Sequence, residues 1–92
     1  MYDILKEEFS YIIFTKRINL NYSQETMAEK CCLSVRQYID LEHGLYLPSF
    51  QTLVNITMNL GFDFNKFIEL IISKGYEPLD KDNSITIKPN LF

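Results

Sequence analysis

The sequence predicts an all-α domain of five helices followed by a short C-terminal tail. Five stretches place apolar residues at helical spacing, and Ser, Asp, Asn and Gly residues that start or stop helices separate them. Only ITIKP, at 85–89, alternates apolar and polar residues as a strand does. Because 92 residues form a single hydrophobic core, we expect one helical domain over 1–75 and a tail over 76–92.

The first predicted helix covers residues 2–18, which contain neither Gly nor Pro. At about 100° per residue, its apolar side chains fall on two opposite faces. One face carries Tyr2, Leu5, Phe9, Ile12 and Ile13, and the other carries Ile4, Tyr11, Phe14 and Ile18. We therefore expect this helix to be covered on both sides.

Two short helices follow, with Cys-Leu-Ser between them. The second helix starts after Ser23, a favourable N-cap residue, and runs to about Cys31. The third starts after Ser34, which forms a capping box with Gln37, and stops at Gly44 in the left-handed conformation. The inward side chains are expected to be Met27, Ala28, Cys31, Tyr38 and Leu41. Such a pair of helices indicates a helix-turn-helix unit.

The fourth and fifth helices complete the predicted domain. Ser49 caps the fourth helix, FQTLVNITMNL, and either Asp63 or Asn65 caps the fifth, NKFIELIISK; Gly61 and Gly75 stop them. The fourth helix is expected to bury Leu53, Ile56, Thr57 and Leu60. Apolar residues cover about half of the fifth helix, which is wide for one core; they are Phe64, Phe67, Ile68, Ile71 and Ile72.

The tail and the extra apolar faces favour a homodimer. A single strand over ITIKP has no partner within the chain. The tail therefore either folds back over the first helix or pairs with the tail of a second subunit. Both arrangements hide apolar surface that a small monomer would otherwise expose.

Composition and motifs exclude several classes of protein. No apolar run reaches the roughly 18 residues of a membrane span, and acidic residues in MYDILKEEF argue against an export signal, which favours a cytoplasmic protein. There is no Gly-rich phosphate loop, HExxH motif or nucleophile elbow, so we expect neither an enzyme nor a cofactor. The adjacent Cys31 and Cys32, with His43 as the only histidine, lack partners for a metal site and are expected to be buried thiols.

Residues 23–49 carry a specific combination of features. They are Ser23-Gln24-Glu25, Ala28, Ser34, Tyr38, Leu41, Glu42, Gly44 and Pro48-Ser49, preceded by KRINLNYSQ. At these spacings the segment resembles the helix-turn-helix of the Cro/phage-repressor (XRE-type) transcription regulators, and the resemblance covers roughly residues 9–70. It implies a lambda-repressor-like fold that binds double-stranded DNA, with the third helix in the major groove.

The resemblance also assigns DNA contacts. The positions that match the family's base-reading residues are Ser34, Val35, Arg36, Gln37 and Asp40. Arg36 would bind guanine through two acceptors, Gln37 would bind adenine, and Val35 would contact a thymine methyl. Gln24 would bind a phosphate with its side chain or its backbone amide. Without the resemblance, these side chains would form an ordinary solvated helix face.

Other positions have two interpretations or depart from the family. The resemblance implies an ion pair between Arg17 and Glu42, and the alternative for Arg17 is a phosphate contact. Tyr46 would donate a hydrogen bond to a phosphate, or the apolar loop 45–47 would contact a protein partner. Cys32 stands where the family usually has Gly, which predicts a positive φ at this residue.

Charge separates two functional hypotheses. Residues 23–49 contain two basic residues, Lys30 and Arg36, and four acidic residues, which gives a local net charge of −2. The whole chain has a net charge of −3. Phosphate attraction is therefore weak. The first hypothesis is a dimeric transcription regulator, a repressor on a palindromic operator, controlled by concentration, degradation or a protein antagonist. The second is a helix-turn-helix domain that has lost DNA binding and serves as a protein–protein interaction module.

Overall fold

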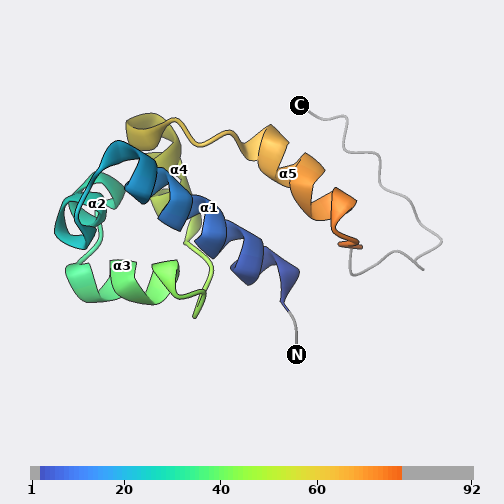
Figure 1. Cartoon of the computed structure of the whole chain (residues 1–92), viewed down its shortest axis with the longest axis horizontal. Coiled ribbons are helices and arrows are strands. Elements are labelled where there is room, and N and C mark those ends of the chain that lie inside the picture. Colours follow the sequence, from blue (N-terminus) through green and yellow to red (C-terminus); the bar gives the residue numbers. More distant parts are fainter. Residues whose placement is uncertain (1–2, 78–92) are drawn as a thin grey trace.

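A computed structural model describes residues 3–77 of the chain, and over this range the protein forms five α-helices (Figure 1). They are α1 (Ile4–Leu20), α2 (Gln24–Cys31), α3 (Val35–Glu42), α4 (Phe50–Leu60) and α5 (Phe64–Ser73). The prediction of an all-α, five-helix fold is confirmed, and residues 3–77 contain no strand. The strand expected over ITIKP lies outside the described residues.

Side-chain caps determine where the helices begin. At all five N-termini the N-cap side chain accepts a hydrogen bond from the backbone N–H three residues later; the caps are Asp3, Ser23, Ser34, Ser49 and Asp63. Of the two residues predicted as possible N-caps of α5, Asp63 and not Asn65 caps the helix. The first helix extends beyond the predicted residue 18 to Leu20, where Asn21 caps it in a left-handed conformation with φ of 58°.

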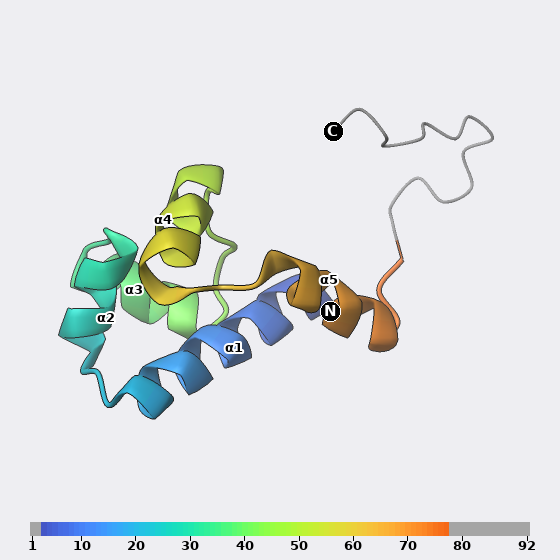
Figure 2. The ribbon, with the colours of Figure 1, turned by 90° about the horizontal axis from the view of Figure 1, so that it is seen from above.

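The long helix α1 organises the rest of the fold. The helices α2, α3 and α4 gather around its C-terminal half, and α5 lies along its N-terminal half (Figures 1 and 2). All five helices contribute to the core, which consists of Phe9, Ile13, Met27, Ala28, Cys31, Tyr38, Leu41, Ile56, Leu60, Phe67 and Ile71. The inward residues predicted for the second and third helices are confirmed.

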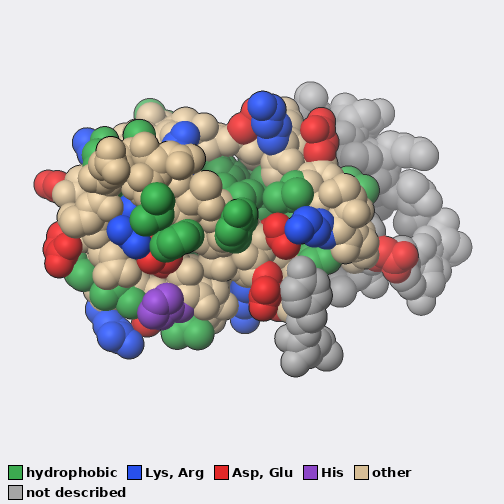
Figure 3. Space-filling model, viewed as in Figure 1, with side chains coloured by type: hydrophobic (Ala, Val, Ile, Leu, Met, Phe, Trp, Pro, Cys, Tyr) green, Lys and Arg blue, Asp and Glu red, His purple; other side chains and the backbone are tan. Residues whose placement is uncertain are grey.

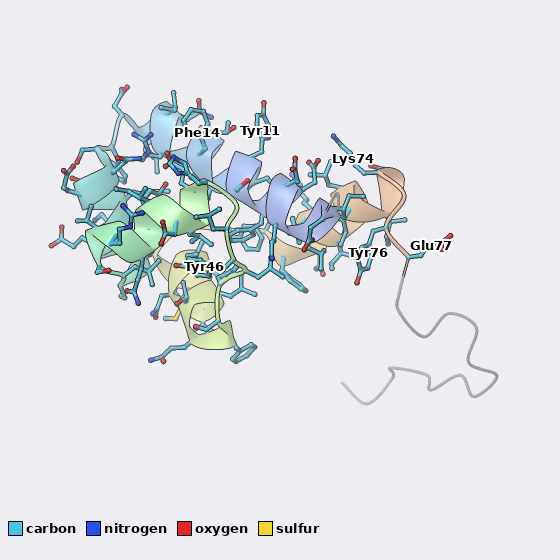
Figure 4. All side chains as sticks on the ribbon, turned by 90° about the horizontal axis from the view of Figure 1, so that it is seen from below. Tyr11, Phe14, Tyr46, Lys74, Tyr76 and Glu77 are labelled. Atoms are coloured by element: carbon cyan, nitrogen blue, oxygen red, sulfur yellow. The ribbon has the colours of Figure 1, made fainter. Side chains whose placement is uncertain are left out.

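The two faces of α1 have different surroundings. Phe9 and Ile13, from the first predicted face, are buried in the core. Tyr11, Phe14 and Ile18, from the other face, remain exposed, and Figure 4 shows Tyr11 and Phe14 on the side of α1 turned away from α3 and α4. Within residues 3–77 only Ile4 of this face packs against the core, and the expected cover by the tail or a second subunit lies outside the described residues.

The buried face of α4 contains different residues from those predicted. Thr52 is buried with Ile56 and Leu60, whereas Thr57 is exposed and Leu53 is half-buried. The face that packs against α2 is therefore rotated from the predicted one. On the solvent side, the Thr57 hydroxyl donates to the Leu53 carbonyl at 2.8 Å, which satisfies it within its own helix.

No helix in the described part of the chain is long and apolar enough to cross a membrane.

Candidate nucleic-acid interface

The helix α3 is anchored on one side and open on the other. Tyr38 and Leu41 are fully buried and attach it to the core. At its start, the Ser34 hydroxyl accepts from the Gln37 backbone N–H at 3.1 Å, and the Gln37 side-chain oxygen accepts from the Ser34 N–H at 3.0 Å. This capping box fixes the first turn, which is the part of a recognition helix that contacts base edges.

The turn before α3 depends on one left-handed residue. Cys32 has φ of 60°, as predicted, and caps α2 with hydrogen bonds from its backbone N–H to the carbonyls of Ala28 and Glu29. Cys31 is buried, and burial raises the pKa of its thiol to about 12. Cys32 is exposed, so the expectation of two buried thiols is wrong at this position, because the left-handed turn directs residue 32 outward.

The outward face of α3 carries the residues assigned to base contacts. Ser34, Val35 and Gln37 are exposed, and the side chain of Arg36 is 79% exposed. Arg36 Nη2 lies 3.4 Å from Asp40 Oδ1, a distance that makes an ion pair on the helix surface without a well-aligned hydrogen bond. Because Asp40 is half-buried and Arg36 is not, the guanidinium can leave Asp40 for an acceptor in a groove.

Two of the assigned side chains have other partners in this structure. The Gln37 side-chain oxygen already accepts one hydrogen bond in the capping box, which leaves its second lone pair and the amide N–H groups for other partners. The Tyr46 hydroxyl donates to the backbone carbonyl of Gln37 at 2.7 Å. Tyr46 lies beside α3 in Figure 4, and this bond attaches the loop after α3 to its first turn. The single proton of the phenol is therefore already donated.

A polar network joins α3 to α1 and α2. Arg17 Nε and Nη2 bind the two carboxylate oxygens of Glu42 at 2.7 and 3.1 Å, and Nη1 donates to the Tyr22 carbonyl at 3.1 Å. Gln24 adds a hydrogen bond from its side-chain amide to Glu42 at 3.2 Å. The side chains of Arg17 and Glu42 are only 15% and 6% exposed. Such a bidentate pair fixes the helix orientation as well as the distance.

The pKa of Glu42 reflects this network. Burial by itself would raise the pKa of its carboxyl, but the hydrogen bonds from Arg17 and Gln24 outweigh burial, and the pKa is lowered. The hydrogen bond to Glu42 is the largest influence on Arg17, whose pKa is raised. Both groups therefore stay charged at neutral pH, and each neutralises the other.

The role of Gln24 in this network was not apparent from the sequence. Its position directly after the N-cap Ser23 predicted only a phosphate contact. The carboxylate of Glu42 lies eighteen residues away in the chain, and no periodic pattern indicates such a contact. The Gln24 side chain thus supports the Arg17–Glu42 pair, while its backbone N–H at the start of α2 has no partner within the helix.

The electrostatics around α3 do not form a basic surface. Lys30 and Arg36 are the basic residues within 23–49, and both are exposed. The nearby Arg17 adds no free charge, because Glu42 neutralises it. Figure 3 shows acidic and basic side chains interspersed on the face it displays, with hydrophobic side chains reaching the surface between them. In the described part of the chain, no cluster of His, Cys, Asp or Glu residues could hold a metal ion.

Five helices, a three-residue turn closed by a left-handed residue, and an outward helix held by a buried ion pair define a helix-turn-helix protein. A comparison with protein families agrees: the helix-turn-helix family matches residues 13–67, more than half of the chain. The chain belongs to this family, which supports a DNA-binding regulator and, at the level of the family, the resemblance to Cro/phage-repressor proteins. A comparison with curated proteins and one with solved structures found no match.

Proposed function

We propose that this protein is a sequence-specific transcription regulator that places the first turn of α3 in the major groove of DNA and acts as a repressor. The observation that carries the proposal is the geometry of α3. Its inner side is fixed by buried Tyr38 and Leu41 and by the Arg17–Glu42 pair, while its first turn is exposed. A rigid helix with an open first turn is what base contacts require.

Arg36 is the main base contact in this proposal. Its guanidinium is the most exposed charge on α3 and has only the surface partner Asp40. It can present two parallel N–H donors to guanine, and Asp40 keeps it extended along the helix until it does so. Val35 and Ser34, on the same turn, contribute an apolar contact to thymine and a short polar contact.

Gln37 has a narrower role than the sequence implied. Bidentate binding of adenine uses both the oxygen and the nitrogen of the side-chain amide. Since the Ser34 N–H holds the oxygen at the start of α3, we assign the base contact of Gln37 to its amide N–H groups, which suit acceptors such as the O6 and N7 atoms of guanine.

The phosphate contacts come from backbone groups in this proposal. The N–H of Gln24 at the start of α2 is oriented for a phosphate oxygen, while its side chain supports Glu42. Tyr46 would have to give up its bond to Gln37 before it could donate to a phosphate, so we assign it the support of α3.

A homodimer on a palindromic operator follows from the weak electrostatics. A unit with so few exposed basic residues neutralises few phosphates, so a single copy has low non-specific affinity. Two copies of α3 about 34 Å apart would enter successive major grooves and act together on one site. The experiment that tests the function is a DNA titration at two salt concentrations, with operator sequences selected from random fragments.

The decisive variant is Arg36→Ala, compared with Lys66→Ala on α5 as a control of the same charge. Arg36→Ala should weaken specific binding by about 1–3 kcal/mol per contact and relax the base preference. Lys66→Ala should leave the base preference unchanged. Equal binding by the wild type and the Arg36→Ala variant across all sequences would contradict base reading by α3.

A second candidate function is a protein–protein interaction module. It is favoured by the loop after α3, where Leu45 is 61% and Leu47 is 40% exposed, and by the acidic balance of residues 23–49. If this function holds, the wild type should show no selectable DNA sequence at low salt. The same titration therefore separates the two candidates.

A further inference from the structure

An apolar trough lies along α4 and α5, and none of its lining residues belongs to α3. It consists of two hollows, of about 280 and 330 Å³, which share Leu53 and Phe64 as a common wall. The first hollow reaches Tyr76, and the second lies between Phe50 and Met58 on α4. Apart from Thr57 and Tyr76, every side chain that lines the two hollows is apolar.

The rims of this trough are unusually exposed for a small protein. Phe50 is 82% exposed, Met58 is 78% exposed and Phe64 is 48% exposed. Each large apolar side chain costs about 1.5–3 kcal/mol when it stays in water rather than in a core. Contiguous apolar surface of this kind marks a place where another segment binds.

The chain itself supplies a segment with matching chemistry and reach. It leaves the described structure at Glu77, directly after Tyr76, so it departs from the edge of the first hollow. Eight residues later come Ile85 and Ile87, with Thr86 between them. Eight residues can reach at most about 26–29 Å, which exceeds the length of α4, about 16 Å for its eleven residues.

The spacing within this segment suits the trough. In an extended chain, Ile85 and Ile87 would lie on one face, roughly 6.6 Å apart. Two apolar side chains on one face suit two adjacent apolar hollows that share Leu53 and Phe64 as a wall. The segment Ser84–Ile87 is uncharged, and so is the lining of the trough, so that no charge has to be desolvated for the two to meet.

We propose that the α4–α5 trough binds the segment around Ile85 and Ile87 of its own chain. The short tether gives the segment a millimolar effective concentration, so even a weak contact fills the site. The outer face of α1, with Tyr11, Phe14 and Ile18, stays free in this arrangement. The proposal is independent of DNA binding.

The test compares two full-length variants of the segment. The double substitution Ile85→Asp with Ile87→Asp removes the two apolar side chains, and Thr86→Asp places a charge on the opposite face as the matched control. Methyl NMR signals of Leu53, Val54 and Met58 should shift in the double variant and not in Thr86→Asp. Binding of a hydrophobic dye should rise severalfold in the double variant alone, with an unchanged helical circular dichroism signal.

A synthetic peptide of residues 82–92, added to the double variant, should restore the wild-type methyl signals. Adding Met58→Asp to the double variant should prevent this, and Met58 is exposed enough to be changed without unfolding the domain. Unchanged trough signals in the double variant would overturn the proposal. Shifts that depend on protein concentration would overturn it in favour of a second copy, and shifts confined to the outer face of α1 would move the docking site there.

Discussion

The helix-turn-helix unit and the α4–α5 side of the molecule differ in how fully their apolar side chains are buried. In the unit, Met27, Cys31 and Tyr38 have no exposed surface, and the ion pair of Arg17 with Glu42 joins its helices to α1. On the α4–α5 side, Phe50, Met58 and Phe64 at the rims of the trough are exposed among the described residues.

Under the two proposals made above, the two regions have different requirements: base contacts need a rigid surface, and the trough needs an apolar segment that fills it. A helix that contacts base edges has to keep its side chains within a fraction of an ångström, which buried packing and a bidentate ion pair provide. An apolar trough has no such directional partners and accepts whatever apolar segment is held near it. The following substitutions test how much the fixed contacts of the helix-turn-helix unit contribute to the free energy of unfolding.

The largest effect is expected from Glu42→Gln. This substitution leaves the Arg17 guanidinium buried without its carboxylate, and the free energy of unfolding should fall by about 3 kcal/mol, as measured by urea denaturation. The control is Asp40→Asn, which removes the partner of the exposed Arg36 and should change the stability by less than about 1 kcal/mol. Similar losses in both variants would mean that the buried ion pair contributes no more to stability than the exposed one.

The same carboxylate predicts how stability depends on pH. The pKa of Glu42 is lower in the folded protein than its ordinary value of 4.5. Its stabilising contribution is therefore complete above about pH 4.5 and is lost as the pH falls through the lower, folded pKa. Glu42→Gln should show a smaller loss of stability over this acid range, which denaturation at several pH values would measure.

An intermediate effect is expected from Gly44→Ala. Gly44 has φ of 75°, and an added Cβ would lie 3.2 Å from Ser10 Oγ and 3.6 Å from the Lys6 carbonyl of α1. We expect a loss of about 2 kcal/mol in thermal unfolding, of which the left-handed conformation accounts for about 1 kcal/mol. Gly61 has φ of 71°, and no atom lies within 4 Å of an added Cβ. Gly61→Ala should therefore lose only the stability that the left-handed conformation costs.

The smallest effect, and a gain, is expected from Cys32→Gly. Cys32 holds a left-handed conformation that Gly adopts without strain, so the substitution should stabilise the domain by up to about 1 kcal/mol. Asn21→Gly is the matched comparison, because Asn21 has φ of 58° but belongs to a residue type that tolerates it. A larger gain at Asn21 than at Cys32 would contradict this account.

The helices could be predicted from the sequence because their ends are coded locally. Ser23, Ser34 and Ser49 each bond to the backbone three residues later, and such a contact depends on few neighbours. The buried face of α4 could not be assigned in the same way. Apolar residues surround much of that helix, and only its packing against α2 decides that Thr52 rather than Thr57 is buried.

The candidate interface was predictable as a location but not as a set of available atoms. The outward turn of α3 follows from the spacing of Tyr38 and Leu41. Whether the amide of Gln37 or the hydroxyl of Tyr46 is free to meet DNA depends on contacts between side chains and distant backbone groups. Residue type and spacing do not encode those contacts.

In the proposed function, the capping box at the start of α3 affects any attempt to alter the preferred DNA sequence. A library that randomises residue 37 alone would select for helix formation and for base contact at the same time, because Gln37 and Ser34 close the helix together. Variants with a new base preference would then be discarded for poor folding. Randomising 34 and 37 as a pair, with Asp or Asn allowed at 34 to cap the helix alone, would make these two demands independent.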